Sequence, residues 1–276
     1  MMLASNTLNL SRAQVMAIIN LTPDSFYAQS RNLTTKEARC SVERAVADGA
    51  TIVDLGGYSS RPGAQDVTVD EEWRRVRLGL EAVRSVDCGV VVSVDTFRSE
   101  IVRRAVCEFG DIVVNDISAG ELDAQMIATV ARLGLTYVAM HMRGVPETMQ
   151  SMTHYESGVV CSVVDYFRKR AKQLEDAGVM PERIILDPGF GFAKSAEQNY
   201  ELLTHLSALA ELGYTTLAGV SRKSMIYRPL GITAEESLPG SLAFAWEALR
   251  GGARIIRVHD VAPTRQLVDL FNHYNG

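Results

Sequence analysis

Three side chains rich in hydrogen-bond acceptors stand directly after short apolar runs, and together they could bind a flat heterocycle. Asp95 lies in "SVDT", Asn115 in "NDIS" and Asp187 in "LDPGFGFAK". A carboxylate can accept two parallel N–H bonds from a 2-amino-pyrimidinone edge, and an asparagine amide adds one donor and one acceptor in a plane. Each residue alone could be a helix cap or a hydrogen-bonded core group. As a set they suit a pterin or a purine.

Cationic side chains cluster after the last two apolar runs, where they could bind phosphate groups. Arg222 and Lys223 lie in "SRKS", and Arg257 and His259 lie in "RVHD". Because residues two apart on a strand point to the same face, Arg257 and His259 are expected to face one site. Ser224 is expected to open a helix, whose N-terminal amide groups could hold a further anion. The alternative is that these are ordinary solvated charges.

Two further segments bring polar groups to the same region. The stretch "NLTPDSFYAQSR", residues Asn20–Arg31, combines an amide, a hydroxyl, a carboxylate and an aromatic ring after an apolar run. Asparagine is a poor choice if the only task is to end a strand, whereas its neutral oxygen suits a hard cation such as Mg²⁺. Arg61, within "SSRPG", adds another cation.

The elements that must position these residues form a regular series. Apolar, β-branched runs alternate with helical patterns, which indicates βα units on a parallel sheet. The runs are continuously apolar, so the sheet should be buried on both faces. Eight such units in 276 residues predict one α/β domain over residues 1–276, a single (β/α)8 TIM barrel. The runs are Val15–Ile19, Thr51–Leu55, Val90–Val94, Ile112–Val114, Thr136–Met140, Arg183–Leu186, Thr215–Val220 and Arg254–Val258.

A barrel also explains why nearly every run is followed by polar residues, because the carboxyl ends of its strands converge on one face, where active sites lie. An open doubly wound sheet is the alternative, but no glycine-rich dinucleotide fingerprint follows the first run. The helical patterns between the runs are Thr35–Asp48, Glu71–Val83, Ser99–Phe109, Asp123–Leu133, Val159–Ala177, Gln198–Leu212 and Gly240–Arg250.

Composition narrows the class of protein and its partners. The net charge of −5 argues against a nucleic acid or an acidic membrane as a partner. Hydrophobic residues make up 47% of the chain, yet no apolar run reaches the length of a membrane span. The cysteines lack the spacing of metal ligands and are expected to be reduced thiols of a cytoplasmic protein. They are Cys40, Cys88, Cys107 and Cys161.

Taken in order, the motifs resemble those of the dihydropteroate synthase family. The match runs from about Val15 to Val261, and no one motif would suffice, but together they are highly specific. Enzymes of this family join 6-hydroxymethyl-7,8-dihydropterin pyrophosphate to 4-aminobenzoate and release pyrophosphate in folate biosynthesis. The resemblance implies a pterin-binding TIM barrel, a transferase of a family that sulfonamides target, Mg²⁺ as cofactor and a homodimer formed through outer helices. The motifs are "NLTPDSF", "SSRPG", "SVDT", "NDIS", "MHMRG", "LDPGFGFAK", "SRKS" and "RVHD".

The resemblance also implies a role for each matching residue. For the pterin, the implied partners are Asp95, Asn115, Asp187 and Lys223, with Met140 and Gly219 lining the ring and Arg257 stacked on it. For the pyrophosphate they are Asn20 as the Mg²⁺ ligand, with Ser60, Arg257 and His259. For 4-aminobenzoate they are Ser224 at the carboxylate and a wall of Arg61, Pro62, Phe26 and Phe192.

The implied chemistry agrees with these residue types. Pyrophosphate leaves well only when its charge is neutralised, as Mg²⁺, Arg257 and His259 could do. Its departure would leave a methylene cation conjugated with the pterin, which the Asp95 carboxylate could stabilise. Since the amine is a weak nucleophile, dissociation before attack is expected, without a covalent intermediate on cysteine or serine. The implied catalytic residues are Asp95, Lys223, Arg257 and His259.

The chain departs from the commonest family pattern in one loop. Many members continue "SFSDGG", whereas Ala28 and Gln29 stand here at the aspartate and the position after it. The loop carboxylate is therefore missing or supplied by Asp24. Ser60 replaces the more usual threonine and keeps the hydroxyl. Two alternatives follow, a non-catalytic paralogue that only binds pterin and a pterin-dependent methyltransferase, and an assay of pyrophosphate release would separate both from a synthase.

Overall fold

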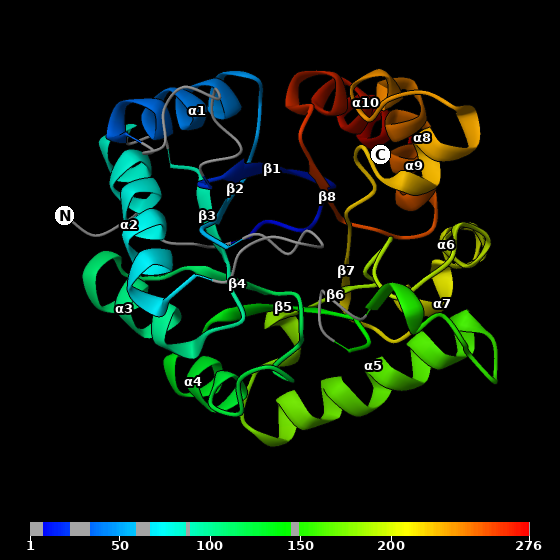
Figure 1. Ribbon diagram of the computed structural model, residues 1–276, viewed down its shortest axis with the longest axis horizontal. Coiled ribbons are helices and arrows are strands. Elements are labelled where there is room, and N and C mark those ends of the chain that lie inside the picture. The colour runs from blue at the N-terminus through cyan, green and yellow to red at the C-terminus, as the bar shows by residue number, and fades with distance from the viewer. Residues whose placement is uncertain (1–7, 23–33, 59–66, 87–88, 145–148, 276) are drawn as a thin grey trace.

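The computed structural model describes residues 8–22, 34–58, 67–86, 89–144 and 149–275. Within these residues eight parallel strands follow one another around a closed barrel, and β8 pairs with β1. Helices form a ring outside the strands (Figure 1). The predicted (β/α)8 barrel is confirmed. The strands are β1 Gln14–Asn20, β2 Ile52–Gly56, β3 Val91–Asp95, β4 Val113–Asp116, β5 Thr136–Met140, β6 Ile184–Asp187, β7 Thr215–Ala218 and β8 Ile255–Val258.

Local sequence signals set the helix ends. Thr34 and Ser195 begin α1 and α6 with capping boxes, in which each hydroxyl accepts from the third backbone N–H and a Glu or Gln side chain returns the bond. Gly134 and Gly231 end α4 and α8 in the left-handed conformation. The helices are α1 Thr35–Ala47, α2 Val69–Val86, α3 Ser99–Phe109, α4 Met126–Leu133, α5 Val159–Asp176, α6 Ala196–Thr204, α7 Ser207–Ala210, α8 Ser224–Leu230, α9 Leu238–Arg250 and α10 Val261–Tyr274.

One predicted helix is divided in two. The pattern over residues 198–212 predicts a continuous helix, but α6 ends at Thr204 and α7 starts at Ser207. The Thr204 hydroxyl donates to the Tyr200 carbonyl at 2.9 Å, and the ring of His205 contacts the Glu201 carbonyl at 2.9 Å. Side chains that bond to backbone carbonyls in this way compete with the helical ladder. Leu206 lies at the break and is fully buried, so the apolar pattern of the segment continues although the helix is interrupted.

The barrel interior is packed below and polar above. Side chains alternate along each strand, so outward residues pack against the helices while inward ones fill the barrel. The inward floor is a separate cluster of buried residues, namely Met16, Ile52, Val113, Val138, Ile185, Leu217 and Ile255. Above it, the strand register pairs Asn20 with Gly56, Gly56 with Asp95, and Asp95 with Asn115. These positions therefore lie at one level near the carboxyl ends of the strands.

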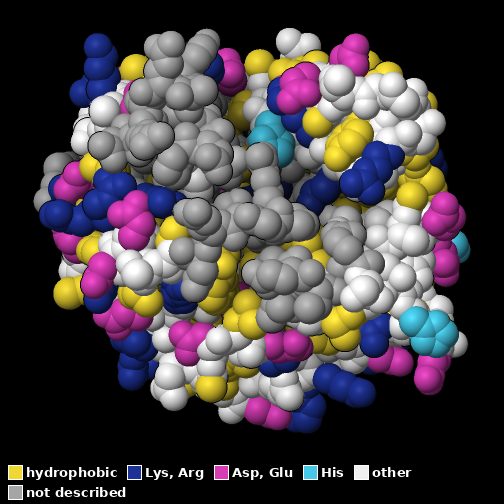
Figure 2. All heavy atoms as spheres, viewed as in Figure 1, with side chains coloured by type: hydrophobic (Ala, Val, Ile, Leu, Met, Phe, Trp, Pro, Cys, Tyr) yellow, Lys and Arg dark blue, Asp and Glu magenta, His cyan; other side chains and the backbone are white. Residues whose placement is uncertain are grey.

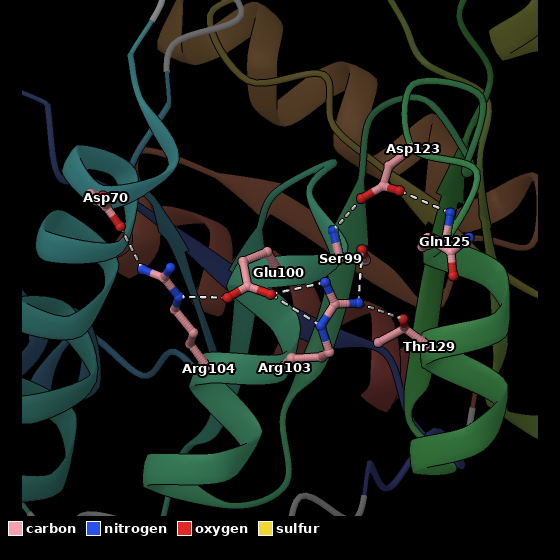
Figure 3. Close-up of polar contacts among 8 residues, drawn as sticks. All are labelled: Asp70, Ser99, Glu100, Arg103, Arg104, Asp123, Gln125 and Thr129. Atoms are coloured by element: carbon pink, nitrogen blue, oxygen red, sulfur yellow. Dashed lines mark hydrogen bonds and ion pairs between the residues drawn. The ribbon is translucent and has the colours of Figure 1, made fainter.

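Polar contacts join the outer helices α2, α3 and α4 (Figure 3). The guanidinium of Arg104 donates to Glu100 on its own helix and to Asp70 on α2, each at 2.8 Å. Asp123 accepts from the Ser99 backbone N–H at 2.7 Å and so satisfies an N-terminal amide of α3. Because these pairs are largely exposed, each contributes only up to about 1 kcal/mol. Their role is to fix how the helices sit around the barrel.

The structure also bears on the predictions about membrane spans and cysteines. No helix within the described residues is long and apolar enough to cross a membrane. Cys40, Cys107 and Cys161 are exposed free thiols, as expected, while Cys88 lies outside the described residues.

Candidate active site

A cavity of about 670 Å³ opens at the carboxyl ends of the strands. Figure 2 shows basic side chains and a histidine near the middle of this face, on the side of β8 and α8 to α10. The residues that line the cavity come from strands far apart in the sequence, as a barrel mouth requires. The sequence-predicted residues among them are Asn20, Asp95, Asn115, Met140, Asp187, Phe192, Gly219, Lys223, Ser224, Arg257 and His259.

Arg257 organises the polar floor of this cavity. Its Nε donates to Asp54 at 2.7 Å and its second terminal nitrogen donates to Asp95 at 2.8 Å. The same Asp54 carboxylate accepts from the Asn115 amide at 2.9 Å and from the Ser93 hydroxyl at 2.5 Å. Arg257 therefore binds two carboxylates, those of Asp54 and Asp95. Asp54 in turn binds two residues of the predicted pterin site, Arg257 on β8 and Asn115 on β4.

Asp54 is the main residue of this polar network that the sequence analysis missed. It lies within β2 and is fully buried, so it does not line the cavity. A signal was present, because Asp54 is the one charged residue inside the otherwise apolar stretch "TIVDLG". Acidic residues are almost never fully buried unless they are paired. Its partner, Arg257, is distant in sequence and reaches it across β1, which pairs with both β2 and β8.

The two acceptor carboxyls of the cavity have raised pKa values. Burial raises the pKa of Asp95, the nearby Asp54 raises it further, and the Arg257 guanidinium opposes both. Burial also raises the pKa of Asp187, against the Gly189 backbone N–H, which donates to its Oδ1 at 2.8 Å. A carboxyl group of this kind can accept ring N–H groups when ionised and can take up a proton at little cost.

The cations differ in how freely they can meet an anion. Burial lowers the pKa of Lys223 to about 8, so the ammonium still predominates at neutral pH. Burial and the Arg257 charge lower the pKa of His259 to about 4, so that imidazole is neutral in the empty cavity. Arg222 lines the cavity, but its guanidinium makes two bonds to Asp260 at 2.9 and 2.6 Å. Lys223, Arg228 and Arg257 also line the cavity as positive charges, and the Arg257 guanidinium is shared between Asp54 and Asp95.

The start of α8 brings two predicted residues together with an aromatic wall. Lys223 caps α8 with extended backbone, and Ser224 is the first helical residue, as predicted. The Lys223 ammonium lies 4.5 Å from the centre of the Phe192 ring, within the range of a cation–π contact. Ser221 was not predicted, but its hydroxyl contacts the His259 ring at 3.2 Å and accepts from the His259 backbone N–H at 3.2 Å.

Comparison with known proteins places this site in a family. The sequence profile described as pterin binding enzyme matches residues 16–259. A dihydropteroate synthase of Haemophilus influenzae is 41% identical over 265 residues, which cover 96% of this chain and 94% of that protein. The enzyme of the same name from Escherichia coli K12 is 41% identical and covers 94% and 90%, respectively. The chain belongs to the dihydropteroate synthase family.

Solved structures of the dihydropteroate synthase family share this barrel. The Xanthomonas albilineans enzyme with 4-aminobenzoic acid superposes with a TM-score of 0.89 at 38% identity, covering 98% of this chain and 95% of that one. The Yersinia pestis enzyme in a sulfonamide drug complex gives a TM-score of 0.90 at 35% identity and covers 97% and 96%. The resemblance inferred from the motifs is therefore confirmed by whole-chain sequence and by fold.

Some predicted site residues cannot be placed. Ser60, Arg61 and Pro62 of "SSRPG" lie outside the described residues, as do Asp24, Phe26, Ala28 and Gln29 of the opening loop. Their assigned roles stay predictions. Tyr58, just before "SSRPG", is described and lines the cavity, and its ring packs edge-on against Phe97 at 5.1 Å.

The amide oxygen of Asn20 is the predicted ligand of a hard metal ion. Within the described part of the chain, no cluster of three or more His, Cys, Asp or Glu could hold a metal by itself. Mg²⁺ does not need such a cluster, because it commonly uses one or two protein oxygens with water and substrate phosphates. Asn20 lies at the end of β1 and lines the cavity at the level of Asp95. Its amide oxygen fits a metal that enters together with pyrophosphate.

Proposed function

We propose that this chain is a dihydropteroate synthase that condenses (7,8-dihydropterin-6-yl)methyl pyrophosphate with 4-aminobenzoate. One observation carries the proposal, namely that a single cavity joins a ring of acceptors to a cluster of cations. Asp95, Asn115 and Asp187 provide the acceptors, and Lys223 and Arg257 provide the charge. Relatives of this chain have been solved with 4-aminobenzoic acid and with 7,8-dihydropteroate, which are a substrate and the product of this reaction.

The pterin is proposed to lie on the polar floor. Asp187 and Asn115 line the cavity from β6 and β4, and both are nearly fully buried. Their oxygens would accept the ring and exocyclic N–H groups, and the amide and Lys223 would donate to ring acceptors. Met140 and Gly219 line the same cavity as flat or flexible walls. Arg257 is held by Asp54 and Asp95, so its planar guanidinium is already oriented for stacking.

The pyrophosphate is proposed to lie toward Asn20, Arg257 and His259. When bound, Mg²⁺ would neutralise part of the phosphate charge at the Asn20 oxygen. Arg257 would carry the permanent positive charge of this subsite. His259 would gain a proton or donate from its ring once the anion arrives, because a nearby negative charge raises the pKa of an imidazole. Ser221 holds that ring in place through its hydroxyl.

The reaction is proposed to begin with loss of the leaving group. The C–O bond to pyrophosphate breaks with its electron pair on oxygen, and positive charge develops on the pterin methylene. Asp95, which donates no proton when ionised, faces the cavity and would stabilise that charge. The amine nitrogen then forms the C–N bond and loses one proton to the solvent or a nearby base. Lys223, Arg257 and His259 complete the proposed catalytic set.

4-Aminobenzoate is proposed to bind at the outer edge of the cavity. Ser224 opens α8 and would receive the carboxylate, and Phe192 would flank the ring. Ser60, Arg61 and Pro62 are proposed to complete this wall. The proposed enzyme acts in the cytoplasm on small molecules, without nucleic acid or membrane, as one pterin-binding barrel domain over residues 1–276. A homodimer through outer helices is proposed because Leu230, Leu270 and Tyr274 expose 64%, 63% and 78% of their surface.

A direct assay tests the function. The purified protein is supplied with the pterin pyrophosphate, Mg²⁺ and 4-aminobenzoate, and both pyrophosphate and dihydropteroate are measured. A synthase releases both in equal amounts and only with both substrates. A pterin-binding paralogue would bind the pterin without turnover, and a methyltransferase would release no pyrophosphate. Either result would overturn the proposal. Light scattering at several protein concentrations tests the homodimer.

A further inference from the structure

A buried lysine lies directly behind the wall of the cavity. Lys194 ends the segment that follows β6, has 4% of its surface exposed, and is not among the residues that line the cavity. Among the described residues its ammonium has three partners, the His141 Nδ1 and the carbonyls of Gly189 and Phe192, each at 3.0 Å. An ammonium has three protons. Each proton therefore has an acceptor, which is what a buried charge requires.

The geometry also defines the state of His141. This residue directly follows β5 and is 3% exposed. Since an ammonium can only donate, Nδ1 must accept and the ring proton must lie on Nε2. Burial and the charges of Lys194 and Arg143 lower the pKa of His141 well below its usual value, so the ring stays neutral. The ring packs against Tyr166 at 4.9 Å, which leaves it little freedom to turn.

The two carbonyls that Lys194 holds belong to residues that shape the proposed pterin site. The backbone N–H of Gly189 donates to the Asp187 carboxylate at 2.8 Å, and the Phe192 ring lies under the Lys223 ammonium. The backbone N–H of Phe192 also donates to the Gly189 carbonyl at 3.1 Å. A single ammonium thus fixes the turn that aims Asp187 and the aromatic wall that carries Lys223.

The backbone of the turn at Gly189 is tightly constrained. Gly189 has φ +67°, and a Cβ at this position would overlap the His141 carbonyl oxygen. The His141 backbone N–H donates to the Asp187 carbonyl at 2.9 Å, which ties the end of β5 to the end of β6. Any shift of the Gly189 carbonyl would therefore be passed to Asp187 rather than absorbed locally.

We propose that Lys194 is a positioning residue for the pterin subsite and that it acts through His141 and the carbonyls of Gly189 and Phe192. The inference rests on the proposed function only in naming the pterin as the ligand of Asp187. The pairing is also expected to be sensitive to pH. A neutral amine has two N–H donors and one lone pair, so either one acceptor loses its hydrogen bond or the His141 ring must move its proton from Nε2 to Nδ1 and donate to the amine.

Burial and the neighbouring charges set the pH range in which Lys194 loses its proton. Burial lowers the pKa of Lys194 to about 7, the Asp187 carboxylate opposes this shift, and the Lys223 ammonium adds to it. His141 faces it as a neutral ring, with Arg143 beyond. The contribution of Lys194 to pterin affinity should therefore weaken as the pH rises through about 7, the range in which Asp95 also titrates, and before Lys223 loses its own proton near 8. Removing Lys194 should remove this contribution and leave those of Asp95 and Lys223.

The test compares Lys194→Met with Lys194→Arg and with the surface control Lys172→Met. Lys172 lies on α5 and pairs with Asp176 in solvent. Calorimetry with the pterin pyrophosphate alone should show about tenfold to a hundredfold weaker binding for Lys194→Met. KM for the pterin should rise in parallel, and the difference in affinity from the wild type should shrink as the pH rises through about 7. Lys194→Arg should recover part of the affinity, and Lys172→Met should match the wild type.

The melting temperature separates positioning from a general loss of structure. Lys194→Met removes a buried charge but leaves three buried acceptors without their donor, which destabilises a protein, so this variant should melt below the wild type. Binding is therefore measured well below its melting temperature, and wild-type affinity in the folded Lys194→Met protein would overturn the proposal. If this variant does not fold, His141→Phe keeps the packing and removes one acceptor, and unchanged affinity there would equally overturn it. A wild-type protein that does not bind the pterin would instead overturn the proposed function.

Discussion

The Arg257 guanidinium reaches across β1 and donates from Nε to the fully buried Asp54 carboxylate at 2.7 Å. A guanidinium has five N–H donors in a fixed fork, so Arg257 can hold Asp54 and Asp95 and still meet a ligand. Asp54, which does not line the cavity, therefore orients Arg257, which does. Asp54 has no route to the substrates and would act only through Arg257 and Asn115.

Asp54→Asn should weaken both stability and turnover while preserving shape. Breaking a buried ion pair costs about 3–5 kcal/mol, and because Asp95 still holds Arg257, the expected loss is near the lower end. Turnover should fall about tenfold to a hundredfold, as expected when a catalytic group is misplaced by about 1 Å. Denaturant unfolding and steady-state kinetics would measure the two effects.

The matched control for this variant is Asp165→Asn. Asp165 forms an exposed pair with Arg168 on α5, and such pairs contribute at most about 1 kcal/mol. An Asp54→Asn protein as stable and as active as Asp165→Asn would show that Arg257 needs no partner beneath the cavity.

Asp187→Ala should weaken pterin binding without unfolding the protein. The carboxylate lies at the end of β6 and accepts from Gly189. Its loss would leave pterin N–H groups unpaired, at a cost of about 1–3 kcal/mol or more. Titration calorimetry with the pterin pyrophosphate measures this, with circular dichroism to verify the fold. Unchanged affinity in a folded Asp187→Ala protein would remove Asp187 from the pterin subsite.

Most of the fold and the cavity wall follow from sequence pattern. Continuously apolar runs that alternate with helical patterns define βα units, and a closed barrel brings the ends of all such runs together. This is why Asp95, Asn115, Asp187, Lys223 and Arg257, predicted from local motifs, line one cavity. No contact between them had to be known in advance.

What the sequence could not supply depends on contacts between distant segments. Asp54 and Arg257 meet only because β1 lies between β2 and β8. The neutral state of His259 comes from burial next to Arg257, and the Arg222 charge is directed to Asp260, 38 residues away. The break after Thr204 has a local cause, because Thr204 and His205 contact carbonyls four residues earlier, but the apolar pattern of the segment does not reveal it. The sequence marks Asp54 as a lone charge in an apolar stretch but does not indicate its partner.

His259 should take up a proton when pyrophosphate binds. Its pKa is about 4 in the empty protein, below the usual value of 6.5. The folded state thus binds this proton more weakly than the unfolded chain, so His259 favours folding above about pH 6.5 and loses that contribution as the pH falls toward 4. Pyrophosphate should reverse the shift by raising the pKa.

Calorimetry in buffers of different ionisation enthalpy measures that uptake without Mg²⁺ near pH 6. Pyrophosphate itself titrates in this range, so the decisive quantity is the difference between the wild type and His259→Gln. The wild type should take up more protons, and Arg257→Ala and His259→Ala should both bind pyrophosphate more weakly. Because 4-aminobenzoate is expected to bind only after pyrophosphate, it should lose affinity indirectly in both variants. Equal proton uptake in the wild type and His259→Gln would exclude His259 from the anion subsite.

Asn20→Ala should reduce turnover far more than Gln29→Ala. Asn20 is the last residue of β1 and is held by pairing with Gly56, and a ligand on a rigid element contributes more than a contact formed only when a loop closes.

The variant Asp24→Asn separates two roles of Asp24. If Asp24 supplies the missing loop carboxylate, turnover should fall and the Mg²⁺ requirement should rise. If Asp24 only shapes the turn at Pro23, both should change little, because Asn is also accepted in turns. Steady-state kinetics over a Mg²⁺ titration measures all three variants, and normal turnover with normal Mg²⁺ dependence in Asn20→Ala would remove Asn20 from the metal site.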